Sequence, residues 1–278
     1  MIVKTDAVVL KSMRFRDTSK IVTFYTRRYG KLSAIAKGAR TPKSKFGAAL
    51  EPMTGVSLVL YKKEQRELQL VSQCDIIKPY KKIHAEMNRM AAALSVLELL
   101  HQLTHDEEEH PALFLLLEQT LDALETAPRN HGNYLYAFEL RLSALFGFSP
   151  VLGACVRCGS RQVYDGPLSM ITFQLDKGGL VCGTCGQPAG GVLQSLAVRR
   201  QEHSRRTEWN RPSLLLLRKQ TARIMERLFT ADFESLGGLE FSKEVGNELD
   251  ETLRSYLQYH FEDLRPLRST RVFRSMAT

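Results

Sequence analysis

The chain has 278 residues, of which 44% are hydrophobic and 25% are charged, a composition typical of globular proteins that bury a substantial core. No stretch approaches the roughly 18 uninterrupted apolar residues that a membrane span needs, and the first residues lack the apolar segment of a signal peptide, so we expect a cytoplasmic protein without membrane contact. Five cysteines are too few for a disulfide framework at this length.

The formal net charge of +9 is concentrated in the first third of the chain. Residues 1–82 hold 18 Lys and Arg against 6 Asp and Glu, a net charge of +12, whereas the remainder has a net charge of −3. Such segregation is the electrostatic footprint of a polyanionic partner, and a basic surface that only improves solubility is the alternative. Residues 83–126 carry nine acids and the single Arg89, so this segment should repel nucleic acid.

The first 80 residues are rich in Val, Ile, Leu and aromatic residues, in runs separated by polar or Gly- and Pro-containing segments. This pattern predicts five β-strands. The five-stranded oligonucleotide-binding (OB) β-barrel has this strand count, and an SH3-like barrel is the alternative. The predicted strands are residues 2–11, 20–26, 31–37, 54–61 and 67–77.

From Lys81 the apolar residues recur at spacings of three and four, which predicts an amphipathic helix through residues 83–101. Pro111 is placed to open a second helix, because proline is tolerated in a first helical turn. The sequence therefore predicts a multidomain α+β protein with an OB-fold domain, an α-helical domain and an inserted module. Further helices are expected at residues 134–146, 213–230 and 241–261, and the three domains at 1–80, at 81–149 with 191–278, and at 150–190.

Four of the cysteines form two Cys-x-x-Cys pairs, Cys155 with Cys158 and Cys182 with Cys185, which 23 residues separate. Two intervening residues let a tight turn present two thiolates to one ion, so the pairs predict one structural Zn²⁺ per chain with no open coordination position. An iron-sulfur cluster and a redox dithiol pair are the alternatives. The surrounding residues 150–190 show little apolar periodicity, so we expect a loop-rich segment that the metal holds together. Cys74 is expected to be a buried thiol.

Two basic clusters are candidates for contact with a nucleic-acid backbone. One is expected in a loop after the first strand and the other in a longer loop after the third, where flexible basic segments can adapt to phosphates. Among the nearby aromatics, Phe15 is the better candidate for base stacking, because Phe24 and Tyr25 are neighbours on one strand and one of them should be core. The DNA-binding candidates are Lys11, Arg14, Phe15, Arg16, Lys37, Arg40, Lys43 and Lys45, with Arg205 and Arg206 from a second basic run whose alternative is a solvated helix face.

The sequence contains no Gly-x-x-x-x-Gly-Lys-Ser/Thr phosphate loop, no Gly-x-Gly-x-x-Gly after a strand and no His-Glu-x-x-His. We therefore expect no catalytic chemistry, and a metal-dependent nuclease is the enzyme alternative. His105 and His110 flank the acidic run at residues 106–109, which can imitate a metal cluster but is more typical of a solvated loop.

Residues 9–26, 30–40 and 46–53 together resemble the RecO family of recombination mediators. The order of barrel, helical domain and four-cysteine module also resembles that family over nearly the whole chain. Where the family commonly has acidic residues after the loop aromatic, this chain has Asp17 followed by Thr18 and Ser19.

The resemblance implies a nucleoid-associated protein of DNA repair that binds single- and double-stranded DNA and anneals complementary strands. It also implies that, with RecR, the protein helps to load RecA onto strands covered by single-strand-binding protein (SSB). The SSB C-terminal tail is expected to contact the helical domain, and RecA would be engaged indirectly. A zinc-ribbon nucleic-acid-binding protein of transcription or translation is the alternative reading.

Overall fold

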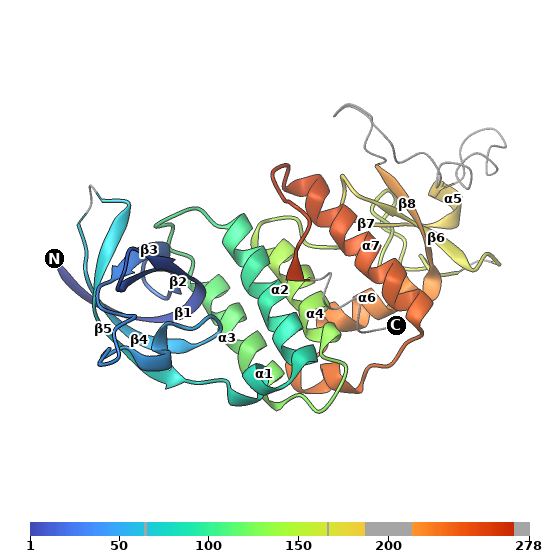
Figure 1. The fold of residues 1–278 in the computed structure, drawn as a ribbon. Coiled ribbons are helices and arrows are strands. Elements are labelled where there is room, and N and C mark those ends of the chain that lie inside the picture. The colour runs from blue at the N-terminus through green and yellow to red at the C-terminus, as the bar shows by residue number, and fades with distance from the viewer. Residues whose placement is uncertain (64–65, 166, 187–212, 270–278) are drawn as a thin grey trace. The chain divides into compact units, whose positions relative to one another are not determined.

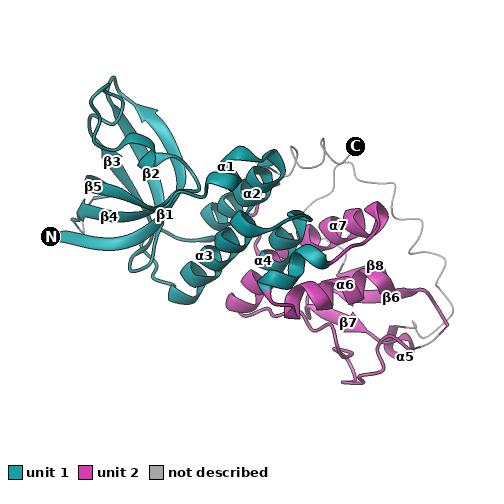
Figure 2. Ribbon diagram, turned by 90° about the horizontal axis from the view of Figure 1, so that it is seen from below, with its two compact units in different colours: residues 1–138, 233–238, 265–278 teal, residues 139–232, 239–264 magenta. Residues whose placement is uncertain are grey.

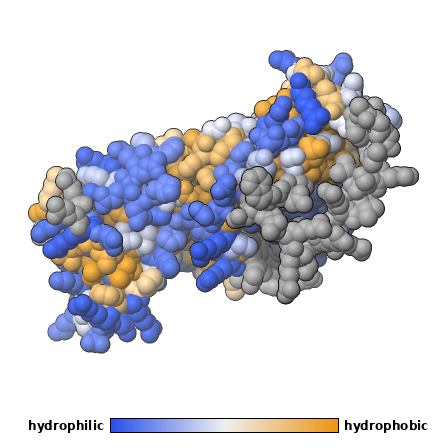
Figure 3. Space-filling view, turned by 90° about the horizontal axis from the view of Figure 1, so that it is seen from above, coloured by the Kyte–Doolittle hydropathy of each residue, from blue (hydrophilic) through white to orange (hydrophobic). Residues whose placement is uncertain are grey.

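The computed structural model describes residues 1–63, 66–165, 167–186 and 213–269. They form two compact units, drawn in different colours in Figure 2. The first unit comprises residues 1–138, 233–238 and 265–278, and the second comprises residues 139–232 and 239–264. Within the described part of the chain, no helix has the length and apolar character to cross a membrane. On the face drawn in Figure 3, hydrophobic areas are interrupted by hydrophilic ones.

Five strands close into the barrel at the start of the first unit (Figure 1), in the order β1-β2-β3-β5-β4. All neighbouring strands are antiparallel except β3 and β5, whose parallel pairing closes the barrel. The predicted OB-like barrel is therefore confirmed. The strands are β1 (Ile2–Phe15), β2 (Ser19–Thr26), β3 (Gly30–Ala36), β4 (Gly55–Tyr61) and β5 (Leu68–Lys78), and a short 3₁₀ helix, η1 (Gly47–Leu50), precedes β4.

The barrel core consists of the inward-facing side chains of all five strands. Phe24, Leu32 and Leu58 are each no more than 1% exposed, and buried positions alternate with partly exposed ones along β3, as in a half-buried strand. Cys74 belongs to this core, where burial raises the pKa of its thiol. The prediction that Cys74 is a buried thiol is therefore confirmed.

The first strand is longer than the sequence predicts. β1 continues to Phe15 and pairs with β2 through Arg14 opposite Lys20 and Phe15 opposite Ser19. The expectation that residues 11–16 form a loop is therefore wrong. At this end of β1 only β2 is paired with it, and most of the side chains are polar. The sequence therefore lacks the alternation of apolar and polar residues that indicates a strand, although the backbone pairing is complete.

The helices of the first unit follow the barrel (Figure 1), as the change in apolar period predicts. Pro111 stands at the first position of its helix, and the His110 ring accepts a hydrogen bond from the Leu113 N–H at 3.2 Å, which caps that helix. The elements are α1 (Lys81–Ala85), α2 (Met87–Leu103), α3 (Pro111–Thr126), α4 (Gly132–Leu145), whose residues from Glu139 onward belong to the second unit, and the 3₁₀ helix η3 (Phe233–Gly238).

The described part of the second unit contains a three-stranded sheet in the order β7-β6-β8, the end of α4 and three further helices. Two expectations are wrong here. Residues 214–218 are a strand that pairs with β6 and not the start of a helix, and the cysteine-bearing segment has core side chains of its own, such as Phe173, which meets Tyr256 edge to face. The elements are β6 (Met170–Gln174), β7 (Gly179–Val181), α5 (Gly183–Gly186), β8 (Leu214–Arg218), α6 (Lys219–Thr230) and α7 (Lys243–His260).

A buried carboxyl in the second unit makes its stability depend on pH. Burial raises the pKa of Glu139 well above its usual range, and the charge of Asp250 raises it further. The unfolded chain releases this proton above about pH 4.3, whereas the folded chain keeps it, so the contribution to stability is complete below that pH and declines as pH rises. The decline is about 1.4 kcal/mol per pH unit until the folded pKa is reached.

Glu139→Gln should therefore match the wild type at pH 4 and exceed it increasingly toward pH 8 in thermal or urea unfolding. Replacement of the exposed Glu251 by Gln is the matched control, because it removes the same charge from a solvated position. A wild-type and Glu139→Gln difference that stays constant from pH 4 to pH 8 would contradict the prediction.

Candidate metal centre and nucleic-acid interface

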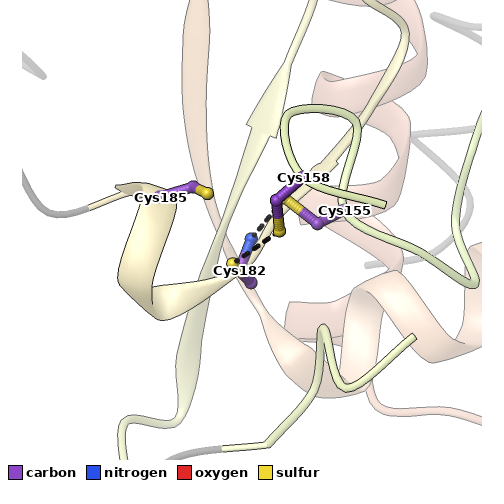
Figure 4. Close-up of side chains that lie close together, drawn as sticks. All are labelled: Cys155, Cys158, Cys182 and Cys185. Carbon is purple, nitrogen blue, oxygen red and sulfur yellow. Dashed lines mark hydrogen bonds between the residues drawn. The ribbon is translucent and has the colours of Figure 1, made fainter. Parts of the chain in front are cut away.

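The four paired cysteines converge on one point (Figure 4). Cys155 and Cys158 come from the loop before β6, Cys182 follows β7 directly, and Cys185 lies in α5. Their sulfur atoms all lie within 4.8 Å of one another, and the Cys158 and Cys182 sulfurs are 3.7 Å apart. Among the described residues, this is the one group of three or more His, Cys, Asp or Glu that could hold a metal ion.

Backbone hydrogen bonds around the cysteines help to hold this arrangement. The Cys182 N–H donates to the Cys155 sulfur at 3.3 Å, and the Val156 N–H donates to the Leu180 carbonyl at 2.9 Å, so the first cysteine turn is bound to β7. Gly159, with φ of +74°, lets the chain turn back just after Cys158. The sheet therefore sets the distance between the two Cys-x-x-Cys pairs.

One arginine joins the two halves of the cluster from outside. The Arg157 guanidinium donates to the carbonyl of Cys185 at 2.8 Å and to the side-chain oxygen of Gln174 on β6 at 3.0 Å. Arg157 lies between the two cysteines of the first pair in sequence, and its hydrogen bond to the Cys185 carbonyl fixes the short helix α5, which carries Cys185. Outer contacts of this kind orient the ligands of metal sites.

The thiols differ in acidity because their hydrogen-bond partners differ. Burial opposes ionisation of Cys155, but N–H donors from Cys182, Arg157 and Cys158 lower its pKa to about 6. Hydrogen bonds with Cys158 and Cys182 favour the neutral thiol of Cys185 and raise its pKa to about 12. A bound cation is what would allow all four groups to be thiolates together, because thiolates are the form that ligates metals.

The basic candidates of the barrel lie on its surface. Lys11 and Arg14 lie on β1 and not in a loop, and Arg16 follows in the tight turn to β2; all three are exposed. Phe15 is only partly exposed, and the Arg16 guanidinium lies 5.1 Å from the centre of its ring. Lys37, Arg40, Lys43 and Lys45 are exposed in the connection after β3, as predicted.

The structure brings these two clusters together. The Arg40 N–H donates to the Thr18 carbonyl at 2.9 Å, and its guanidinium donates to the Arg16 carbonyl at 3.1 Å. The connection after β3 is thereby bound to the β1–β2 turn. We call the joined group the hairpin cluster, and no ion pair among the described residues involves its basic members: Lys11, Arg14, Arg16, Lys37, Arg40, Lys43 and Lys45.

Other basic residues of the barrel are neutralised by acids of the helices. The Arg27 guanidinium lies 2.6 Å from a Glu118 carboxylate oxygen, and the Lys78 ammonium lies 2.7 Å from Asp122, both acids being on α3. Lys31 pairs with Asp106 at 3.4 Å and Lys62 with Glu107 at 2.7 Å. Sequence reasoning missed these pairs, and the acidic run that opposes a basic barrel is the signal that could have suggested them.

The remaining candidates are less accessible or outside the described residues. Phe24 lies in the barrel core, as expected for one of the two neighbours, but Tyr25 is also buried, stacked on Phe114 of α3 with 6.4 Å between ring centres. Neither ring can stack a base. Arg205 and Arg206 lie outside the residues that the structure describes.

Comparison with known proteins gives matches over most of the chain. Residues 1–80 match the family model "Recombination protein O N terminal", and residues 84–215 match "Recombination protein O C terminal". The chain is 31% identical over 276 residues to the DNA repair protein RecO of Chloroherpeton thalassium, which covers 99% of both chains. It is 36% identical over 201 residues to that of Chlorobaculum parvum, covering 71% of this chain and 77% of the relative. With the RecO of Caldanaerobacter subterraneus it shares 26% identity over 259 residues, 93% of each chain.

Proposed function

The chain belongs to the RecO family of DNA repair proteins, and on that premise we propose that it is a recombination mediator that works by binding and not by bond chemistry. In this proposal it binds single- and double-stranded DNA and anneals complementary strands. With RecR it promotes the loading of RecA onto single-stranded DNA covered by SSB, whose C-terminal tail it contacts.

The observation that carries the proposal is the hairpin cluster. Seven basic side chains lie on the β1–β2 hairpin and on the connection after β3, two segments that hydrogen bonds from Arg40 join. Among the described residues they take no part in ion pairs of the kind that neutralise Arg27, Lys31, Lys62 and Lys78. Phosphate contacts of this kind position a strand without reading its bases. Neutralising two phosphate backbones on one basic surface reduces their repulsion, which is the physical requirement for annealing.

We assign DNA binding to an OB-fold domain of residues 1–80 and partner contacts to a helical domain of residues 81–149 and 191–278. The acids of α3 support this division, because Glu118 and Asp122 neutralise Arg27 and Lys78 of the barrel and leave no excess positive charge for a phosphate backbone there. We place the contacts with RecR and with the SSB tail among protein surfaces outside the hairpin cluster.

We propose that the four cysteines bind one structural Zn²⁺ in a module of residues 150–190. Zinc–sulfur bonds of about 2.3 Å in a tetrahedron place neighbouring sulfurs about 3.8 Å apart. The 3.7 Å between the sulfurs of Cys158 and Cys182 agrees with that spacing. Four protein ligands leave no position for a water or substrate, so the ion would stabilise the fold and supply no reaction.

The function is tested by measuring the fluorescence anisotropy of labelled single-stranded DNA against salt concentration. With about five phosphates contacted, the logarithm of affinity should fall with the logarithm of salt concentration at a slope of about −3.5. A variant with Gln at Arg14, Arg16, Lys37 and Arg40 should bind more weakly and show a flatter slope, because fewer counterions are released.

The matched control carries Gln at four exposed basic positions outside the hairpin cluster, Lys63, Arg66, Lys81 and Lys82, and has the same net charge. It should keep a slope close to that of the wild type. Equal flattening in the two variants would mean that DNA responds only to net charge, and an unchanged slope in the first variant would remove DNA from the hairpin cluster.

A further inference from the structure

A hollow of about 500 Å³ opens on the barrel surface beside the hairpin cluster. Residues of the β1–β2 hairpin and of the connection from β3 to β4 line it together. Its volume falls in the range of small-molecule sites and is sufficient for one nucleotide unit. The lining residues are Ser12, Met13, Arg14, Lys20, Ala39, Arg40 and Glu51.

The charges of this hollow are unevenly paired. Lys20 is bound to Glu51, with 2.8 Å between the ammonium nitrogen and a carboxylate oxygen. Arg14 and Arg40 enter no ion pair within the described part of the chain. The hollow therefore has a net charge of two positive units, and Arg40 is held in place there by its hydrogen bonds to the β1–β2 turn.

Glu51 is the more accessible member of its ion pair with Lys20. The side chain of Glu51 is 51% exposed, whereas that of Lys20 is 19% exposed, so Glu51 can turn toward solvent while Lys20 stays in the wall. An ion pair with one exposed partner contributes little to stability, so an incoming anion can replace the carboxylate at small cost.

The hollow also offers contacts that suit the rest of a nucleotide. Ser12 also lines the hollow, but its hydroxyl is buried and offers no direct contact in this conformation; it has no hydrogen-bond partner in the described residues, which is uncommon for a buried polar atom. Met13, with 45% of its surface exposed, and Ala39 add apolar wall beside the three cations. Cations for a phosphate and apolar surface for a sugar or base thus lie within one hollow.

We propose that this hollow binds one phosphate–sugar unit of a DNA strand and that Glu51 competes with the phosphate for Lys20. The inference rests on the proposed DNA-binding function and adds a regulating residue to it. Glu51 limits the affinity of the barrel for DNA, because the phosphate that enters the hollow must displace the Glu51 carboxylate from Lys20. No covalent bond is made or broken in this exchange.

The test measures the affinity of labelled single-stranded DNA for Glu51→Gln at low salt. Removing the competing carboxylate should tighten binding by about fivefold, the upper range for a partly exposed ion pair. Asp75→Asn is the matched control, because Asp75 is an exposed acid of the same barrel that does not line the hollow. That control should change affinity by less than twofold, and both variants should keep the unfolding temperature of the wild type within a few degrees.

A second pair of variants isolates Lys20. Lys20→Gln alone should weaken binding, and Glu51→Gln should give no gain in that background, since there is no ammonium left to compete for. A gain that persists without Lys20, or one that Asp75→Asn reproduces, would overturn the inference while leaving DNA binding by the barrel intact. Failure of the wild type to bind the labelled DNA would instead overturn the proposed function itself.

Discussion

Gly30→Ala is expected to lower the free energy of unfolding by about 3 kcal/mol or more, because two penalties combine at this position. Gly30 opens β3 with φ of +58°, a conformation that costs a residue with a side chain. A β-carbon there would also overlap the backbone carbonyl of Glu108, in the segment between α2 and α3. The start of β3 would have to move away from the segment after α2, which it contacts through the Glu107 N–H and the Lys31 carbonyl at 2.7 Å. Urea unfolding measures the resulting decrease in the free energy of unfolding.

Gly47→Ala is the matched control for this prediction. Gly47 has a similar φ of +49°, but nothing lies within 4 Å of the position that its β-carbon would take. The substitution should therefore cost only about 1 kcal/mol, the backbone penalty alone. Similar losses in both variants would contradict close packing of the barrel against the segment after α2.

Cys155→Ser is expected to reduce bound zinc from one ion per chain to almost none and to destabilise the second unit by roughly 5 kcal/mol. That loss is smaller than the roughly 10 kcal/mol or more that zinc contributes to peptides without a core, because Phe173 and Leu180 are fully buried within this unit. Elemental analysis measures the metal, and hydrogen exchange should become faster in β6 and β7 but not in the barrel.

Cys74→Ala serves as the control for loss of a cysteine elsewhere. It removes a buried thiol from the barrel core, so it should destabilise the barrel by creating a cavity while zinc content stays at one ion per chain. Wild-type protein that contains iron, or that contains no stoichiometric metal, would exclude the zinc assignment. Unchanged stability of Cys155→Ser would exclude a structural role for the ion.

Strands and helices that are indicated by a local sequence pattern were predicted well. The five strands of the barrel alternate apolar and polar residues or carry β-branched runs, and the helix from Pro111 has both a start signal and a regular apolar stripe. Residues 214–217 are four consecutive leucines, which suit a buried strand and a buried helix equally. Pairing with β6 decides between the two, and the paired residues lie 40 to 48 positions apart in sequence, from Gln174 with Leu214 to Met170 with Arg218.

By itself, the sequence determined the class of the fold, the four cysteines that form one cluster and the N-terminal third as the part of the chain that carries the excess positive charge. These follow from local spacing and composition, which do not depend on where distant segments meet. Only the tertiary structure decided which charges are available. Arg27 meets Glu118 across 91 positions, Lys20 meets Glu51 across 31, and Arg40 meets the β1–β2 turn across 24. Electrostatic effects depend on distance in space, so a count of basic residues cannot separate the neutralised ones from those without an ion-pair partner among the described residues.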